Sequence, residues 1–402
     1  MFVRHIIGTI GTRIIGAAVG LMLLVLHAQF LGDTGLGTVA LVVLGVSLST
    51  LLAHVMGGGV LVYFAPRASV PKLLLPSYLW AIGSLGVSIV GLELANLIPE
   101  GYAFSVAGIA FLEILATNHQ SILIGKERIH EANAAFVVRT ILLGAGVICG
   151  IFVFEIRTAH VYVYAALIAN LWWAASTFFF LQKELREAKA LGDSWSWDAA
   201  LAKRMLRLGG ISQGGNAIQL MNYRLDIYLI EAFFPTLGLA MVGRYAAANQ
   251  VGEGIWIVPR AIASVQYSRI ANTDDKGYAR RLSFKIMAMC MALATFGVAL
   301  LLLIPTEGFV WLLGERFSET GRVLLCLAPG IIFWAGSIPL SPYFSGRGKH
   351  AINTWSAGVG LVATIIFGLW LIPELGVVGA AITSSISYGL SWGFQLVMVL
   401  RD

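Results

Sequence analysis

Twelve apolar stretches, each of about 20 residues or more, follow one another along this chain of 402 residues with short connections between them. A helix of that length crosses a hydrocarbon core about 30 Å thick. Because no water is present at that depth, the backbone must satisfy its own hydrogen bonds, and the stretches are too long for barrel strands. The sequence therefore predicts an all-α membrane protein with 12 transmembrane helices. The predicted spans are 6–30, 37–64, 73–97, 102–124, 133–154, 160–181, 208–233, 238–267, 282–304, 322–344, 351–372 and 377–400.

The composition agrees with this prediction. Hydrophobic residues make up 58% of the chain and charged residues only 12%, against about 25% charged residues in an ordinary soluble domain. A soluble core has no room for so much apolar surface. The class of water-soluble globular proteins is therefore excluded.

The connections between the spans alternate between basic and nearly uncharged. The span ends on one side hold 21 of the 27 Lys and Arg residues, Arg139 among them, and those on the other side hold four, while Arg224 and Arg260 lie inside spans. Short basic connections favour the cytoplasmic side of a membrane. We therefore expect a multi-pass protein with both termini in the cytoplasm. The net charge of +6 reflects this topology, and a nucleic-acid partner is not expected.

The longest hydrophilic stretch, 182–207, follows the sixth span. Trp197, Leu201, Met205 and Leu208 recur there at helical spacing, with basic residues between them. This pattern predicts an amphipathic linker helix on the cytoplasmic membrane surface, and a solvated linker is the alternative.

The linker leaves six spans on each side of it, in an N-terminal lobe at 1–181 and a C-terminal lobe at 208–402. An even number of spans returns the chain to the same side, so the two lobes share one orientation, as in a parallel repeat. Weak self-similarity supports the repeat, since FLGDTGLGTVAL at Phe30–Leu41 has a counterpart in FPTLGLAMVGRYAAA at Phe234–Ala248.

Five segments resemble a known family. They are the LG-x-x-GLG turn at Leu31–Gly37, MNYRLDIYLI at Met221–Ile230, VGRYAAANQ at Val242–Gln250, YFSGRGKH at Tyr343–His350 and LIPELGVVGAAITSSISY at Leu371–Tyr388. With these segments the chain resembles the polysaccharide transporter family of the multidrug/oligosaccharidyl-lipid/polysaccharide (MOP) exporter superfamily, the flippases of lipid-linked sugar units such as O-antigen units. One departure is that Asp226 follows Arg224, where many relatives place the Arg after the Asp.

The resemblance implies two pseudo-symmetric six-helix lobes around a central cavity, with alternating access. It also implies that the first, second, seventh and eighth helices line that cavity. An undecaprenyl-diphosphate-linked glycan is the implied substrate, and a bacterial cytoplasmic (inner) membrane is the implied location. The implied process is the biosynthesis of lipopolysaccharide or another polysaccharide, with membrane lipid and other polysaccharide-assembly membrane proteins as partners.

Polar residues inside the eighth span predict a binding site. Asn249, Glu253, Trp256 and Arg260 follow at steps of four, three and four, which places them on one helical face. Charged groups at this depth are costly, so they are functional candidates or partners of one another. Arginine suits a phosphate and an aromatic ring suits the apolar face of a sugar, so we expect a sugar–phosphate ligand. The alternative is a structural ion pair between Glu253 and Arg260.

The first and seventh spans add further candidates. Gln213, Asn216 and Arg224 lie within one arc of the seventh span, so they supply two amides and a guanidinium to the predicted cavity. Arg13 of the first span is a third cationic candidate, with snorkelling to the lipid head groups as the alternative.

Asp226 lies two residues beyond Arg224 and points the other way. Counted from the turn near Pro235, it is level with Arg244 of the next span. We therefore expect a structural Asp226–Arg244 pair that holds this hairpin together.

Other chemistries lack their motifs in the sequence. There is no Walker loop for direct use of ATP, and no CxxC pair or HExxH that would signal a metal site. No cofactor is expected. The outer loops are short and leave little room for a catalytic site, so an enzyme is not expected.

These patterns favour a flippase that moves an isoprenoid-diphosphate-linked oligosaccharide from the cytoplasmic to the outer leaflet. The energy source stays open. Transport is coupled either to H+ or Na+ through an acidic residue such as Glu253, or to the membrane potential. A cation-coupled multidrug exporter of the same superfamily is the alternative function, although the seventh and eighth spans hold at least as many arginines as acids. A non-transporting scaffold of a sugar-assembly complex is a third hypothesis.

Overall fold

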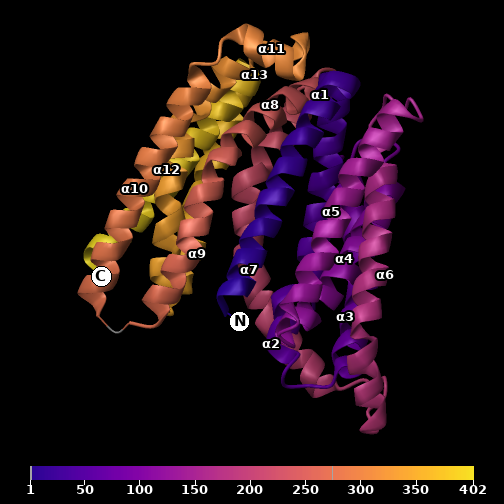
Figure 1. Ribbon diagram of the computed structural model, residues 1–402. Helices are drawn as coiled ribbons and strands as arrows, with labels where there is room; N and C mark the ends of the chain where they lie inside the picture. Colours follow the sequence, from indigo (N-terminus) through magenta and orange to yellow (C-terminus); the bar gives the residue numbers. More distant parts are fainter. Residues whose placement is uncertain (1, 274) are drawn as a thin grey trace. The chain divides into compact units, whose positions relative to one another are not determined.

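The computed structural model describes residues 2–273 and 275–402, with side chains at all of these except 2–10, 13, 264, 268 and 271. Within these ranges the chain forms thirteen α-helices and two short 3-10 helices, and it forms no strand (Figure 1). The helices are α1 Phe2–Ala53, α2 Gly58–Phe64, α3 Val70–Leu94, α4 Ala103–Gly125, α5 Ile129–Phe152, α6 His160–Ala190, α7 Ala199–Phe233, α8 Gly238–Glu253, η1 Gly254–Trp256, α9 Ile257–Ala271, α10 Lys276–Leu302, α11 Thr306–Leu313, η2 Glu315–Phe317, α12 Thr320–Gly346 and α13 His350–Arg401.

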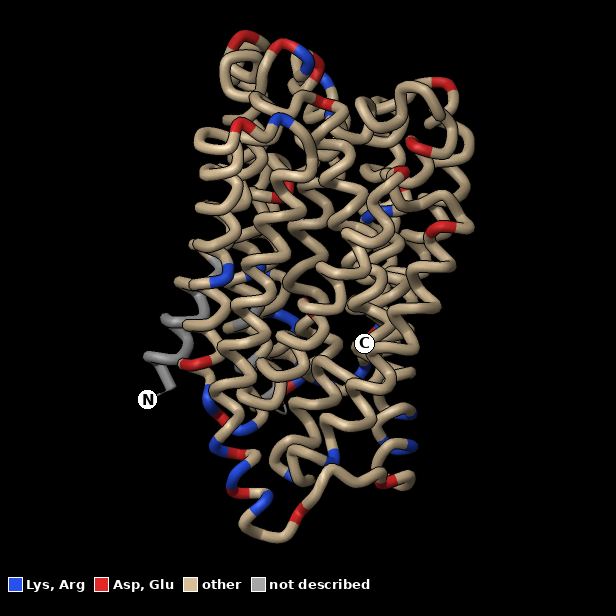
Figure 2. Tube along the Cα trace, turned by 90° about the vertical axis from the view of Figure 1, so that its right-hand side faces the viewer, with Lys and Arg blue, Asp and Glu red and all other residues tan. Residues whose placement is uncertain are grey.

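The helices have the length and apolarity that a bilayer requires. Among the residues that the structure describes, eight helical stretches are long and apolar enough to cross a membrane. Long uncharged runs separate the charged residues along the trace (Figure 2). The prediction of an all-α, multi-pass membrane protein is confirmed.

Two of the long helices each contain two predicted spans. The backbone of α1 leaves the helical conformation at Gly32 (φ 70°, ψ −171°), and that of α13 does so at Gly376 (φ 56°, ψ −128°). Both conformations have positive φ, which a glycine adopts at little steric cost. The turns between the first two spans and between the last two therefore fall at glycines inside the expected connections.

The chain divides into two compact units. Unit 1 comprises Met1–Leu23 and Thr38–Gly214, and unit 2 comprises Leu24–Gly37 and Gly215–Asp402. The turn between the first two spans thus belongs to unit 2, although both of its flanking arms belong to unit 1. The lobe bounds expected from the linker remain predictions.

The second predicted span is interrupted near its end. Helix α1 ends at Ala53, and the chain resumes a helix only at Gly58, which has a φ of +48°. A Cβ at Gly57 would lie 2.2 Å from the Oδ1 atom of Asn118, a fully buried residue of α4. The run of three glycines therefore combines a helix break with a close approach of two helices.

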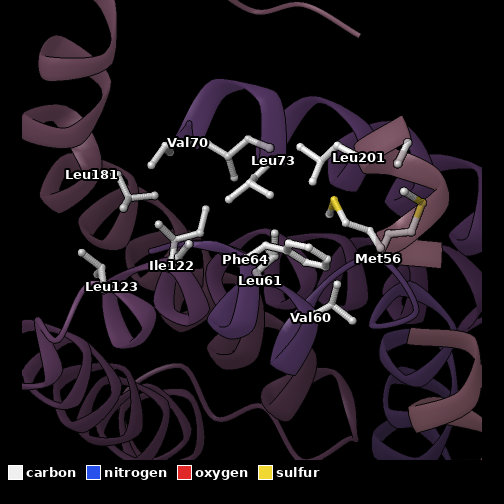
Figure 3. Packing of buried hydrophobic residues seen from close by; sticks show 14 of the residues in the cluster. Met56, Val60, Leu61, Phe64, Val70, Leu73, Ile122, Leu123, Leu181 and Leu201 are labelled. Atoms are coloured by element: carbon white, nitrogen blue, oxygen red, sulfur yellow. The ribbon is translucent and has the colours of Figure 1, made fainter. Parts of the chain in front are cut away.

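A buried apolar cluster surrounds this break in unit 1 (Figure 3). Met56, Leu61, Leu73 and Ile122 pack there with Leu201 of α7. Each of these side chains is at most 5% exposed, so the cluster ties the first turns of α7 to α2, α3 and α4.

The linker differs from its prediction. Helix α6 continues to Ala190, only 191–198 is irregular, and α7 runs without a break from Ala199 to Phe233. Leu201 and Met205 share a face as expected, but protein rather than lipid covers them, at 3% and 0% exposure. The prediction of a separate surface helix is wrong, because nothing between the linker and the seventh span terminates the helix.

Two adjacent glycines of α7 provide a test of this packing. A Cβ at Gly209 would lie 1.7 Å from the carbonyl oxygen of Val55, whereas a Cβ at Gly210 would meet no atom within 4 Å. We predict that Gly209→Ala lowers the free energy of unfolding by about 3 kcal/mol or more through overpacking. Gly210→Ala should change it by less than about 1 kcal/mol.

Thermal unfolding of the two purified variants, followed by tryptophan fluorescence in detergent, compares these effects. Equal melting temperatures for Gly209→Ala and Gly210→Ala would contradict the close packing of α7 against the helix break.

Candidate functional site

An ion pair between α7 and α8 forms the centre of the candidate site in unit 2. The Nη1 atom of Arg224 lies 3.1 Å from Oε1 of Glu253, and the Nδ2 atom of Asn249 donates to the same oxygen at 3.0 Å. The side chains of Arg224 and Glu253 are 31% and 21% exposed. The guanidinium and the carboxylate are therefore paired while both remain partly accessible.

Trp256 lies next to this pair and joins an aromatic cluster. Its ring centroid lies 6.3 Å from that of Trp334 and 5.8 Å from that of Tyr388, and Tyr223 contacts both of these rings. The indole N–H of Trp256 donates to the Ile331 carbonyl at 2.9 Å, and Trp256 is only 1% exposed. Trp256 is thus fixed between α7, α12 and α13.

Arg260 differs from Arg224 in its surroundings. It is exposed, and its guanidinium carbon lies 5.6 Å from the centroid of the Trp256 ring, a cation–π distance. Among the described residues, no carboxylate lies within ion-pair distance of Arg260. The alternative Glu253–Arg260 pair is therefore not formed, and Glu253 pairs with α7 instead.

The predicted stripe on the eighth span is divided by a change of helix type. Helix α8 ends at Glu253, η1 spans Gly254–Trp256, and α9 begins at Ile257. A 3-10 turn winds more tightly than an α-helix, which shifts Arg260 relative to Asn249 and Glu253. The structure thus brings Arg224, Asn249 and Glu253 together, and it places Arg260 beside Trp256.

The predicted Asp226–Arg244 pair is wrong. Asp226 is 1% exposed and accepts hydrogen bonds from the Tyr245 hydroxyl, from Ser384 Oγ at 2.7 Å and from the Ile227 N–H at 2.8 Å. Counting residues from the turn gave the right level along the helix, since Tyr245 neighbours Arg244. It did not give the direction of the side chains around the helix axis.

Arg244 instead pairs with a residue of the first turn. Its Nη2 atom lies 2.8 Å from Oδ2 of Asp33, and Nη1 of Arg316 lies 3.1 Å from Oδ1 of the same carboxylate. The backbones meet beside this triad, since a Cβ at Gly37 would lie 1.8 Å from the Leu239 carbonyl oxygen. The segment 24–37 is therefore held against α8 and η2 within unit 2.

The remaining candidates are spread over both units. Gln213 is buried in α7 within unit 1, and Asn216 is exposed on the same helix where unit 2 begins. Arg13 lies in the part of α1 that belongs to unit 1, and its side chain lies outside the described residues. A role for these three residues in one site remains a prediction.

The sequence analysis missed a polar cluster in unit 1. Arg139, which was assigned to the basic span ends, lies about three turns inside α5 and donates to Asn170 Oδ1 at 2.9 Å. Its Nη2 atom lies 3.5 Å from Glu113 Oε2, and its guanidinium lies 5.4 Å from the Trp173 ring centroid. The available signal was the position of Arg139 within the apolar stretch 133–154.

Comparisons with known proteins give two curated relatives, and no protein-family model matches the chain. The chain is 22% identical over 293 residues to the uncharacterized membrane protein MJ1068 of Methanocaldococcus jannaschii, covering 72% of this chain and 57% of the relative. It is 27% identical over 184 residues to the capsular polysaccharide biosynthesis protein CapF of Staphylococcus aureus, covering 45% of this chain and 43% of the relative. The matches thus span about half the length of these relatives.

The fold is that of the transporters of the MOP superfamily, and the predicted arrangement of twelve spans in two six-helix lobes matches theirs. The structure is similar to that of the lipid II flippase MurJ in an inward closed conformation, with a TM-score of 0.77, 13% identity and coverage of 99% of this chain and 87% of the other. A multidrug resistance MATE family transporter in an inward-facing conformation gives a TM-score of 0.72 at 15% identity, with 96% and 94% covered. A MOP superfamily transporter from Pyrococcus furiosus gives 0.68 at 14%, with 99% and 95% covered.

The Asp33 triad makes a prediction about stability. Asp33→Asn leaves two guanidinium groups facing a neutral side chain at a site where the carboxylate is only 3% exposed, so the free energy of unfolding should fall by about 3 kcal/mol or more. Arg316→Ala should lower it by no more than about 1 kcal/mol, since the side chain of Arg316 is 67% exposed. Thermal unfolding in detergent measures both changes, and similar losses for the two variants would show that Asp33 is not the centre of the triad.

Proposed function

We propose that the protein is a flippase that moves an isoprenoid-diphosphate-linked oligosaccharide, such as an undecaprenyl-diphosphate-linked repeat unit, between the leaflets of a membrane by alternating access. The observation that carries this proposal is the exposed guanidinium of Arg260 beside Trp256, which has no carboxylate partner among the described residues, whereas Glu253 is already paired with Arg224. A guanidinium group without a counter-charge suits an anionic ligand. The names of two similar proteins, a lipid II flippase and a capsular polysaccharide biosynthesis protein, support the same class of substrate.

Arg260 is the residue that makes the first contact with the diphosphate in this proposal. Its guanidinium is exposed and has no carboxylate partner among the residues whose side chains are described. The planar guanidinium group binds phosphate oxygens through two parallel hydrogen bonds. The Trp256 ring below it fixes one face of the guanidinium and leaves the other face for the ligand.

Arg224 takes part in a second step by exchanging partners. Glu253, at 3.1 Å, balances the charge of Arg224. A diphosphate that approaches Arg224 competes for the same guanidinium and leaves Glu253 with the amide of Asn249 as its hydrogen-bond donor. A carboxylate without a cationic partner is costly in a membrane, so Glu253 then takes up H+ or Na+. This exchange links the binding of the anion to the binding of a cation.

Three amide side chains are proposed for the sugar part of the ligand. Gln213 and Asn216 lie on α7, and together with Asn249 they offer donors and acceptors for sugar hydroxyls. Trp256 itself is 1% exposed and packed against Trp334 and Tyr388, so it holds Arg260 in place and does not stack on a sugar ring. Arg13 is proposed as a further cation for the diphosphate.

A cation-coupled multidrug exporter is the second candidate function. The observation in its favour is the similarity to a multidrug resistance transporter, which covers nearly the whole chain. An organic cation needs an accessible acid, however, and in unit 2 both Glu253 and Asp226 already have their partners. Drug susceptibility of a deletion strain separates the two functions, since only loss of an exporter raises sensitivity to organic cations.

The cellular setting follows from the proposed substrate. We place the protein in a bacterial cytoplasmic (inner) membrane with both termini in the cytoplasm, within lipopolysaccharide, O-antigen or another surface polysaccharide pathway. Enzymes that complete the polysaccharide on the outer side are the expected partners. Accumulation of lipid-linked sugar units on the cytoplasmic leaflet of a deletion strain is the expected phenotype.

Transport by arginine variants tests the proposal. We predict that Arg260→Ala and Arg224→Ala each reduce the rate of flipping in liposomes by about tenfold or more, because each loses a charged hydrogen bond of about 1.5–3 kcal/mol to phosphate. Arg269→Ala is the matched control, since Arg269 is exposed on the opposite face of α9. Undiminished flipping by both Arg260→Ala and Arg224→Ala would refute a cationic binding site.

The partner exchange makes a separate prediction for Glu253. Glu253→Gln keeps an acceptor oxygen for Asn249 and removes the charge. Flipping down a substrate gradient should therefore continue. The increase in flipping rate that an imposed H+ or Na+ gradient causes should be about tenfold smaller than in the unaltered protein. Glu374→Gln, an exposed carboxylate of α13, is the control. A gradient effect that survives in Glu253→Gln would assign the coupling to another group.

A further inference from the structure

A pocket of about 440 Å³ opens in unit 1 beside the connection between α2 and α3. Three separate segments line it, namely the α2–α3 connection, the 191–198 linker and the first turns of α7. Its charged and polar lining residues are Arg67, Ser69, Lys72, Asp193, Asp198 and Arg204. Neither the transport site nor the comparisons assign a role to this pocket.

The two acids in the pocket already have partners. Oδ1 of Asp193 lies 2.8 Å from the ammonium group of Lys72, which lowers the pKa of the Asp193 carboxyl and keeps it ionised. Oδ1 of Asp198 accepts the N–H of Leu201 at 2.9 Å, so this carboxylate caps the first turn of α7. Lys72 therefore offsets the charge of Asp193, and Asp198 is held by the helix that it caps.

The two arginines have no such partners. The guanidinium of Arg67 lies 4.1 Å from the centroid of the Tyr63 ring and donates to the Tyr63 carbonyl. Arg204 is exposed, and among the side chains that the structure describes no carboxylate lies within ion-pair distance of it or of Arg67. The pocket thus has guanidinium groups from two different segments in its lining.

The backbone adds to the positive potential. Helix α3 begins in the pocket with Ser69 at its N-cap position, and the Ser69 side chain makes no capping hydrogen bond. The N-terminus of this helix of 25 residues has a partial positive charge that favours an anion, although Pro71 in its first turn has no N–H to donate. Helix end and guanidinium groups therefore act on the same volume.

The surroundings of the pocket are amphipathic. Tyr63 in its wall is 49% exposed, and Trp195 and Trp197 of the adjacent linker are 49% and 56% exposed. Tyr and Trp gather at the level of lipid head groups, where one end of the ring is apolar and the other is wet. These exposed aromatic side chains favour a position of the pocket at the level of the lipid phosphates.

We propose that this pocket binds the phosphate group of an anionic membrane lipid, such as a phosphatidylglycerol head group, between Arg67 and Arg204. The phosphate joins the α2–α3 connection to the first turn of α7, so the bound lipid fixes the start of α7 on unit 1. This site is separate from the transport site in unit 2, and its occupancy is measured without any lipid-linked sugar.

Binding of phosphatidylglycerol to the full-length protein in neutral detergent, followed by native mass spectrometry, tests the site. We expect Arg67→Gln/Arg204→Gln to bind this lipid about tenfold more weakly than the unaltered protein, the factor that corresponds to ~1.4 kcal/mol. The control is Arg186→Gln/Lys189→Gln, which removes the same charge from exposed positions of α6 outside the pocket and should change binding less than about twofold. If the double variant fails to fold, Arg204→Gln alone gives the same comparison, because this exposed residue has no ion-pair partner to lose.

Two further ligands identify the source of the phosphate. Diacylglycerol, which has the same tails and no phosphate, should show no binding that depends on Arg67 and Arg204. Glycerol phosphate, the soluble head group, should bind more weakly than the lipid, and equal binding of the two would support the same site with a soluble phosphate compound as its ligand. Equal losses in the pocket and control variants, or arginine-dependent binding of diacylglycerol, would overturn the proposal.

Discussion

The absence of water in the bilayer core is the constraint on which the rest of this structure depends. A charge placed at that depth is costly unless a polar partner in the protein or a water-filled space stabilises it. Asp226 does so through donors on α8 and α13, and Glu253 does so through Arg224 on α7 and Asn249 on its own helix. These contacts connect the helices of unit 2 at the points where the polar residues lie, so the site and the packing have the same origin.

The sequence predicted the helices and most turns, because these depend on local properties. Apolar length determines a span, and Gly32 and Gly376 adopt the backbone conformations that their turns need. The partners of charged groups were not predictable in the same way. Residue counting gives the depth of Asp226 but not the direction of its side chain, and the true partner of Arg244 is Asp33, some 200 residues earlier in the chain. Arg139 was misassigned because a rule about loop charges was applied to a residue inside a span.

The two guanidinium groups of the candidate site differ in a way that the spacing of residues did not show. Arg224 is balanced by the carboxylate of Glu253, and the guanidinium of Arg260 lies over the ring of Trp256. In the proposed mechanism, Arg260 recognises the ligand and Arg224 then exchanges its partner. Transporters that share this fold are described both as a lipid flippase and as a multidrug resistance protein, so the sign of the charge at this site is a better guide to the ligand than the fold.

The assignment of 24–37 to unit 2 has a consequence for how the molecule can be divided. The chain passes between the units three times, after Leu23, after Gly37 and after Gly214. A fragment that starts at Gly215 would lack Asp33, and the guanidinium groups of Arg244 and Arg316 would lose their shared carboxylate. The two halves of the sequence are therefore not interchangeable modules, and a split protein would reassemble only if its first fragment delivered this short segment to the second.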